Sequence, residues 1–117
     1  MGDLAERDLS SVLAHGLERA AGICKATLER YPASDSELMV ALMRTTAALQ
    51  AALRLHTRDA EVREVSLRIA CELARETATL LRSAGLDEHL LRCADACERV
   101  CYLCEDALAD DGEERAA

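Results

Sequence analysis

Apolar residues recur every three or four positions along most of the chain, which is the spacing of one face of an α-helix. Four amphipathic segments are predicted, over residues 3–30, 35–56, 59–84 and 87–109, with a polar, frayed tail over 110–117. The connections between them are short, so sequential helices lie antiparallel to each other. The pattern therefore predicts an all-α fold, an antiparallel up-down-up-down four-helix bundle that takes in residues 1–117 as one domain.

Local signals mark where these helices begin and end. The first stops at Tyr31-Pro32, because a residue before proline is pushed out of the helical region. The second opens on Ser34-Asp-Ser-Glu37, a capping-box sequence. Asp59 and Asp87 are expected to cap the third and fourth helices, and Gly85 is the expected glycine after the third. The third helix carries two apolar rows, Val62, Val65, Ile69 and Leu73 on one side and Leu67, Cys71, Ala74 and Leu81 beside them.

Composition narrows the functional classes. Half of the residues are apolar, yet the chain has no Phe or Trp, so the core must consist of small aliphatic residues and cysteine. The net charge of −8 disfavours nucleic acid and anionic lipid as partners. The N-terminus has no secretory signal pattern, and no apolar stretch approaches the length of about 20 residues needed for a membrane span. We therefore expect a cytoplasmic protein without a membrane partner, and the sequence leaves open whether it forms a homo-oligomer.

Cysteine is the most informative residue type. Cys93, Cys97, Cys101 and Cys104 follow one another at spacings of four, four and three, which places them along one helix face. Such neighbours have Cβ atoms about 5–6 Å apart, too far for a disulfide but suitable for sharing a metal ion. Thiolates select soft metals such as Cu(I), with Zn²⁺ as the competitor. In the reducing cytosol, six cysteines indicate metal or redox chemistry rather than a disulfide framework.

Counting about 1.5 Å per residue from the end where the first two helices join places the cysteines in levels. Cys24 and Cys93 lie at about 10 Å, with Met43 and Cys97 just above them, and Cys71 and Cys101 lie at about 20 Å. Still higher come His15 and Cys104, with His56 at the far mouth. All six cysteines are candidate metal ligands, and the accessory candidates are His15, His56, His89, Met39 and Met43.

Copper is not the sole interpretation of these residues. Free cysteine is often simply a small buried apolar residue, in which case the chain is a helical protein-interaction module. A thiol redox sensor, or a Zn²⁺ site built from Cys71 and the thiols of the fourth helix, is also consistent with the sequence. No Glu-x-x-His pair, haem-attachment motif, phosphate-binding loop or acid–base constellation occurs in the sequence, so an enzyme is not expected.

The fourth helix also resembles a known family. His89-x-x-x-Cys93-Ala-Asp-Ala-Cys97 resembles the repeated Cys-Ala-Glu-Ala-Cys segments of the cysteine-rich four-helix-bundle copper storage proteins. The family pattern Cys-x-x-x-Cys-x-x-Cys-x-x-x-Cys is matched by Cys93, Cys97 and Cys104, whereas Val100 replaces the third thiol and Cys101 follows it. The resemblance implies interior Cu(I) ions, with histidines near one mouth serving uptake. Because the second helix has no cysteine, the resemblance implies a protein that buffers, stores or donates only a few copper ions. It also implies a partner protein that supplies or accepts the copper.

Overall fold

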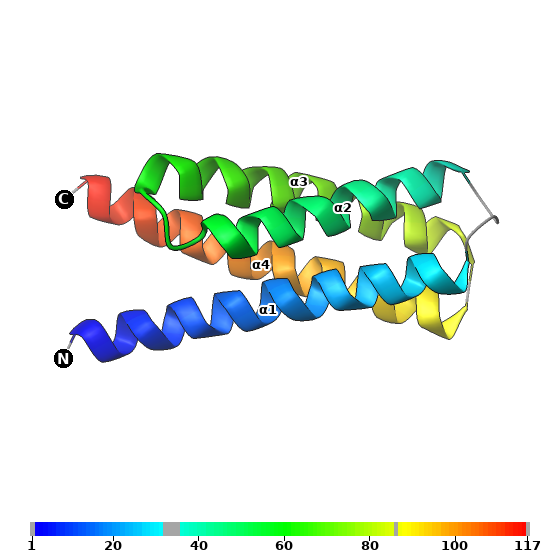
Figure 1. The fold of residues 1–117 in the computed structure, drawn as a ribbon, viewed down its shortest axis with the longest axis horizontal. Coiled ribbons are helices and arrows are strands. Elements are labelled where there is room, and N and C mark those ends of the chain that lie inside the picture. The colour runs from blue at the N-terminus through cyan, green and yellow to red at the C-terminus, as the bar shows by residue number, and fades with distance from the viewer. Residues whose placement is uncertain (1, 32–35, 86, 117) are drawn as a thin grey trace.

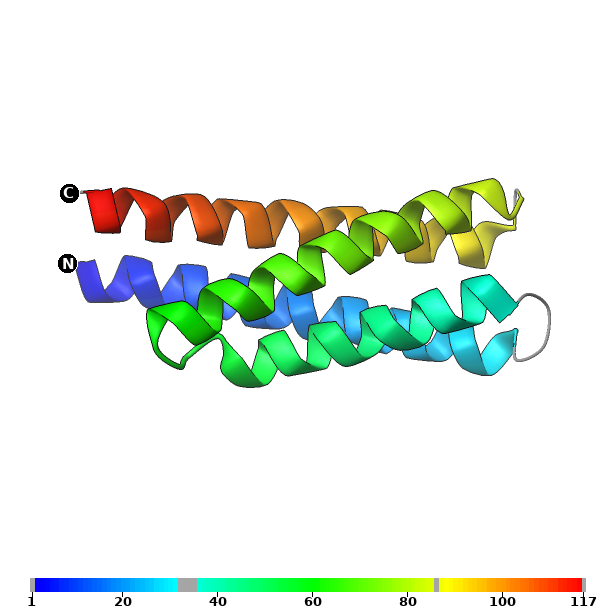
Figure 2. The same cartoon turned by 90° about the horizontal axis from the view of Figure 1, so that it is seen from above.

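Four α-helices account for nearly all of the chain that the structure describes. The computed structural model describes residues 2–31, 36–85 and 87–116, with side chains for residues 10–31, 37–85 and 87–112. The helices are α1 (Gly2–Arg30), α2 (Ser36–Leu55), α3 (Ala60–Ser83) and α4 (Glu88–Ala116). Each packs against two neighbours, in the cyclic order α1, α2, α3, α4. The result is an elongated bundle measuring 48 × 22 × 20 Å, with both termini at the same end (Figures 1 and 2).

The predicted caps of α3 and α4 and the predicted glycine after α3 are confirmed. The Asp59 carboxylate accepts a hydrogen bond of 3.1 Å from the Val62 backbone N–H, as expected of an N-cap. The Asp87 carboxylate accepts one of 2.8 Å from the His89 N–H. Gly85 has φ +136°, a backbone conformation that only glycine adopts without strain. The predicted proline stop and the first residues of the capping box lie outside the described residues.

The fourth helix is longer than predicted. The polar tail over 110–117 is predicted to fray, but α4 continues to Ala116. A tertiary contact supports this extension, because Arg63 on α3 forms an ion pair of 3.0 Å with Asp111. The Arg63 guanidinium also donates to the His56 backbone carbonyl, so one side chain joins the α2–α3 turn to the end of α4. Alanine, glutamate and arginine in this segment are good helix formers once the end is held.

The core contains only one of the two apolar rows of α3. Leu67, Cys71, Ala74 and Leu81 are buried. Val62, Val65 and Ile69 are 38%, 57% and 48% exposed and lie on the outer surface. A buried polar contact lies at the same interface, because the Thr45 hydroxyl on α2 hydrogen-bonds to the Thr77 hydroxyl on α3 at 2.6 Å. At 100° per residue Thr77 lies between the two rows, so it is the burial of the leucine row that shows which row faces inward.

One expectation about membranes needs correction. The helical segment Glu37–Leu55 is long and apolar enough to cross a bilayer, judged by length and composition alone. The sequence pattern is expected to hold no apolar stretch that approaches the length of about 20 residues needed for a span. Within the bundle this helix contributes Leu38, Leu42, Leu49 and Ala52 to the core. The same composition is found in core helices of bundles with no membrane contact, so the finding does not identify a membrane protein.

Candidate metal centre

Three cysteine thiols meet inside the bundle. The Cys24 sulfur on α1 lies 3.7 Å from that of Cys97 and 3.8 Å from that of Cys93, both on α4. All three sulfur atoms lie within 4.8 Å of one another. Each of these residues is 0% exposed. We refer to Cys24, Cys93 and Cys97 as the thiol triad.

The antiparallel arrangement of α1 and α4 positions the triad. Cys93 and Cys97 are one turn apart on α4, so their side chains lie on the same face. Cys24 sits about two turns before the end of α1, and Cys93 lies a similar distance after the start of α4. Because these two ends share one end of the bundle, the three residues fall at the same level. The predicted pairing of Cys24 with Cys93 is therefore confirmed.

The three thiols influence one another's protonation. The hydrogen bonds that Cys93 shares with Cys24 and then with Cys97 lower the pKa of Cys93 below its ordinary value, and the Thr27 hydroxyl adds to this effect. The pKa of Cys24 is raised, chiefly by its hydrogen bond with Cys93, and the pKa of Cys97 is raised by its hydrogen bonds with Cys24 and Cys93. The protonation of the three thiols is therefore linked, and a bound cation would favour their thiolate forms.

This donor set can hold a soft metal ion. All six cysteines are free thiols, so the triad sulfurs are not committed to a disulfide. Thiolate sulfur prefers Cu(I), Zn²⁺ and similar ions over hard cations such as Mg²⁺ and Ca²⁺. Among the described residues, no fourth Cys, His, Asp or Glu donor lies within 4.8 Å of all three sulfurs. Three sulfurs fit Cu(I), and they also fit Zn²⁺ when a water molecule is the fourth ligand.

A second pair of thiols lies about one turn away, between α3 and α4. The Cys101 thiol donates to the Cys71 backbone carbonyl at 3.2 Å, and the Cys71 thiol lies 3.8 Å from the Cys101 carbonyl. Burial raises the pKa of Cys71, and burial also raises the pKa of Cys101 to about 12. We refer to these two residues as the thiol pair. The predicted match in level between Cys71 and Cys101 is confirmed.

The thiol pair has charged neighbours that the sequence interpretation missed. A Glu105 carboxylate oxygen lies 3.7 Å from the Cys71 sulfur, and the Arg75 guanidinium lies 4.0 Å from it. Arg75 and Glu105 also form an ion pair with each other. A signal for both was present, because Arg75 follows Cys71 by four residues and Glu105 follows Cys101 by four.

The remaining candidates lie apart from the triad. Cys104 is fully buried, with its pKa raised to about 12 by burial, but it is not one of the three clustered donors. Met43 is predicted at the level of Cys24 in the interior, whereas it is 57% exposed on the outer side of α2. Met39 is half-buried.

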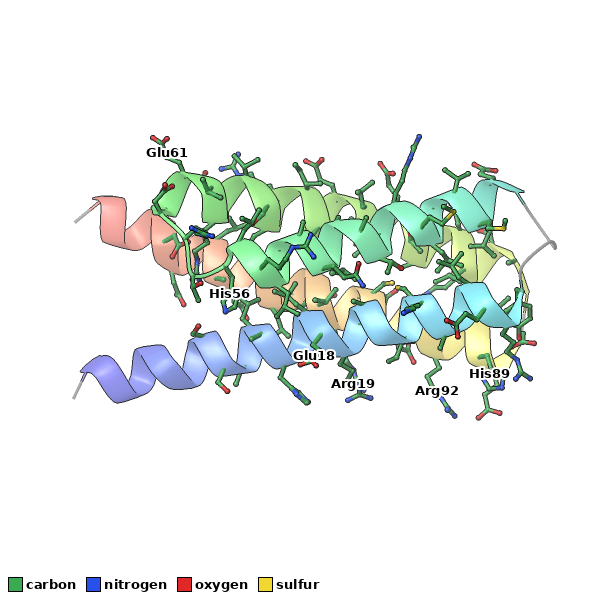
Figure 3. All side chains as sticks on the ribbon, viewed as in Figure 1. Glu18, Arg19, His56, Glu61, His89 and Arg92 are labelled. Carbon is green, nitrogen blue, oxygen red and sulfur yellow. The ribbon has the colours of Figure 1, made fainter. Side chains whose placement is uncertain are left out.

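The three histidines lie at or near the surface. His15 and His89 are exposed, and Figure 3 shows His89 pointing away from the bundle at the start of α4. His56 is half-buried beyond the end of α2, with Nδ1 2.6 Å from the Leu53 carbonyl oxygen. His56 therefore lies at the opposite end of the bundle from the triad, which confirms its predicted position at the far mouth (Figure 3).

Comparison with known proteins returns no match. No family model fits the sequence, and neither a curated protein nor a solved structure is significantly similar to the chain. What defines this protein is therefore its own geometry, a four-helix bundle with a buried thiol triad that can bind a metal ion.

Proposed function

We propose that the chain is a Cu(I)-binding protein that buffers, stores or donates a small number of copper ions through its interior thiolates. The observation that carries this proposal is the thiol triad, which offers three soft sulfur ligands and, among the residues described, no fourth donor. Soft thiolate ligands select Cu(I), and the triad supplies three of them from two helices. The motif resemblance of α4 to copper storage proteins supports the same ion.

Burial explains what such a site achieves. The triad residues are inaccessible to solvent, so a bound Cu(I) ion is kept from water and oxygen. A buffer or donor of this kind acts by binding rather than by catalysis, and it exchanges copper with donor or acceptor proteins. It belongs in a reducing compartment such as the cytoplasm, where free thiols persist.

An anaerobic titration tests the proposal. The reduced protein is titrated with Cu(I) in the presence of a strong competing chelator, while thiolate-to-copper charge-transfer absorbance is followed. We expect at least one equivalent of Cu(I) to be withheld from the chelator, and the variant with Cys93 and Cys97 both changed to Ala to lose it. A parallel Zn²⁺ titration tests the competing metal, which we expect to bind more weakly.

Two results would contradict the proposal. If the chelator removes all copper from the wild-type protein, the cysteines are packing or redox residues. If Zn²⁺ displaces Cu(I) at equal concentration, the triad is a zinc site.

A further inference from the structure

The thiol pair differs from the other cysteines in its access to solvent. Cys71 and Cys101 are 7% and 4% exposed, whereas the other four cysteines are 0% exposed. Cys101 also lines a cleft of about 130 Å³ between α3 and α4, whose rim includes Arg82, Glu98 and Tyr102. Of the six cysteines, these two residues therefore lie nearest to solvent, and Cys101 is the one that lines the cleft.

The ion pair between Arg75 and Glu105 lies beside the same sulfurs. It bridges α3 and α4, and both of its side chains contact the Cys71 sulfur. The Arg75 and Glu105 side chains are 64% and 42% exposed, so a docking molecule can reach and separate them. Exposed ion pairs contribute little stability, so opening this one costs the bundle little.

The thiol pair connects with the triad through α4. Cys101 and Cys97 are separated by four residues on the same helix face, with Cβ atoms about 5–6 Å apart. During a transfer, Cu(I) is held by two neighbouring thiolates, which are ligands that it prefers. In each step one copper–sulfur bond forms while another breaks, and the proton released by the receiving thiol replaces copper on the sulfur left behind. Copper stays Cu(I) throughout, so the transfer needs no oxidant or reductant.

We infer that the thiol pair is the uptake port of the protein, which takes Cu(I) from a thiolate-bound donor at the α3–α4 cleft and passes it to the triad. This inference rests on the proposed function. Entry along the bundle axis from the His56 end is the other route. We prefer the port, because the fully buried Leu17, Leu49 and Cys104 fill the interior between the His56 end and the triad.

Loading kinetics test the port. The apo protein is mixed anaerobically with the Cu(I) complex of glutathione, and charge-transfer absorbance is followed by stopped flow. For the variant with Cys71 and Cys101 both changed to Ala, we expect loading at least tenfold slower with the chelator-measured affinity of the triad unchanged. The control variant His56→Ala should load at the wild-type rate. The port is overturned if the double variant loads as fast as wild type, or if His56→Ala is the slow variant.

A second test of the port uses the wild-type protein alone, so its result does not depend on whether the variants fold. Alkylation of the apo protein with N-ethylmaleimide, followed by mass spectrometry, should modify Cys71 and Cys101 before the other four cysteines. Equal or later modification of these two would overturn the port. If the wild-type protein binds copper but fails the kinetic and labelling tests, only the port is wrong. If it binds no copper, the proposed function itself fails.

A separate observation concerns the outer surface of α2 and α3. The exposed valine row of Val62, Val65 and Ile69 faces Ala48, Ala51 and Leu55 across an almost wholly apolar groove of about 400 Å³. Such a groove is characteristic of a protein contact. It lies on the side of the bundle away from the α1–α4 contact and does not include the uptake port.

The distribution of charge favours a second copy of this chain as the occupant. α4 carries nine acidic and three basic residues, whereas α2 and α3 together carry five acidic and six basic ones. Two copies can therefore meet through α2 and α3 with their acidic helices apart. Exposed Arg44 and Arg54 on α2 complement exposed Glu61, Glu72 and Glu76 on α3, as a two-fold contact of α2 with the partner's α3 requires.

We propose that this face forms a homodimer. Light scattering during size-exclusion chromatography should give the mass of a dimer for the wild-type protein and of a monomer for Val65→Glu and Ile69→Glu. The matched control is Val12→Glu, because Val12 is 53% exposed on α1, outside the groove, and this variant should stay dimeric. A monomeric wild-type protein overturns the dimer, as does binding to phosphatidylcholine vesicles that Val65→Glu abolishes.

Discussion

Changing Cys24 to Ala separates metal binding from packing, because Cys24 is the triad ligand supplied by α1. The substitution removes one buried atom of about methyl size, worth about 0.8 kcal/mol in transfer free energy. A residual cavity of roughly 20 Å³ adds about 0.5 kcal/mol. For a domain of this size the apo melting temperature should fall by about 5 °C. Removing a direct ligand should weaken Cu(I) binding by at least about 100-fold, since losing even an outer-shell partner costs about 10–100-fold.

The matched control is Cys104→Ala. Cys104 has the same burial and chemistry as Cys24 but is not one of the triad donors. Both variants should lose similar apo stability, measured by circular dichroism during heating, while only Cys24→Ala loses affinity in chelator competition. If the two variants bind the first Cu(I) equally well, the triad is not the binding centre and Cys24 is a packing residue.

Three further predictions follow from the same structure. The apo protein should be strongly helical by circular dichroism, since the leucine core needs no metal, and an unfolded apo protein would contradict the bundle. Loading with Cu(I) at about 100 times its Kd should stabilise the protein by about 2.7 kcal/mol, seen as a higher melting temperature. Burial raises the pKa of Cys101 and Cys104 to about 12 from an ordinary value of 9.0, so their contribution to apo stability is complete below pH 9 and is lost as pH rises toward 12. A melting temperature that stays constant across that pH range would argue against buried thiols. Asp59→Ala should lower the free energy of unfolding by about 1 kcal/mol in urea titration, because the Val62 N–H loses its cap, and an unchanged value would mean that the hydrogen bond contributes nothing.

Much of the fold and part of the site could be predicted from the sequence. The α4 cysteines are spaced by four, four and three residues, which places them on one helix face, and all four are buried. The meeting of Cys24 with Cys93 follows from counting residues back from one shared end of antiparallel helices. Such counting gives depth along the bundle but not rotation about each helix axis. Met43 is therefore predicted inside the bundle and yet is exposed.

Rotation about the helix axis also explains the ambiguity in α3. Both of its rows are apolar in the sequence, and the burial of Leu67, Ala74 and Leu81 in the structure shows which row faces inward. The predicted end of α4 was wrong for a similar reason. The extended part of α4 forms an ion pair between Asp111 and Arg63, residues 48 positions apart, and local helix propensity does not predict such a contact.

The most direct test of the central claim is X-ray absorption at the copper edge on protein loaded anaerobically with one equivalent of Cu(I). The thiol triad predicts copper bound by three sulfur atoms, with this signature lost in the variant with Cys93 and Cys97 both changed to Ala. Coordination by nitrogen or oxygen, or a three-sulfur signature that survives in that variant, would contradict the assignment of Cys24, Cys93 and Cys97 as the metal centre.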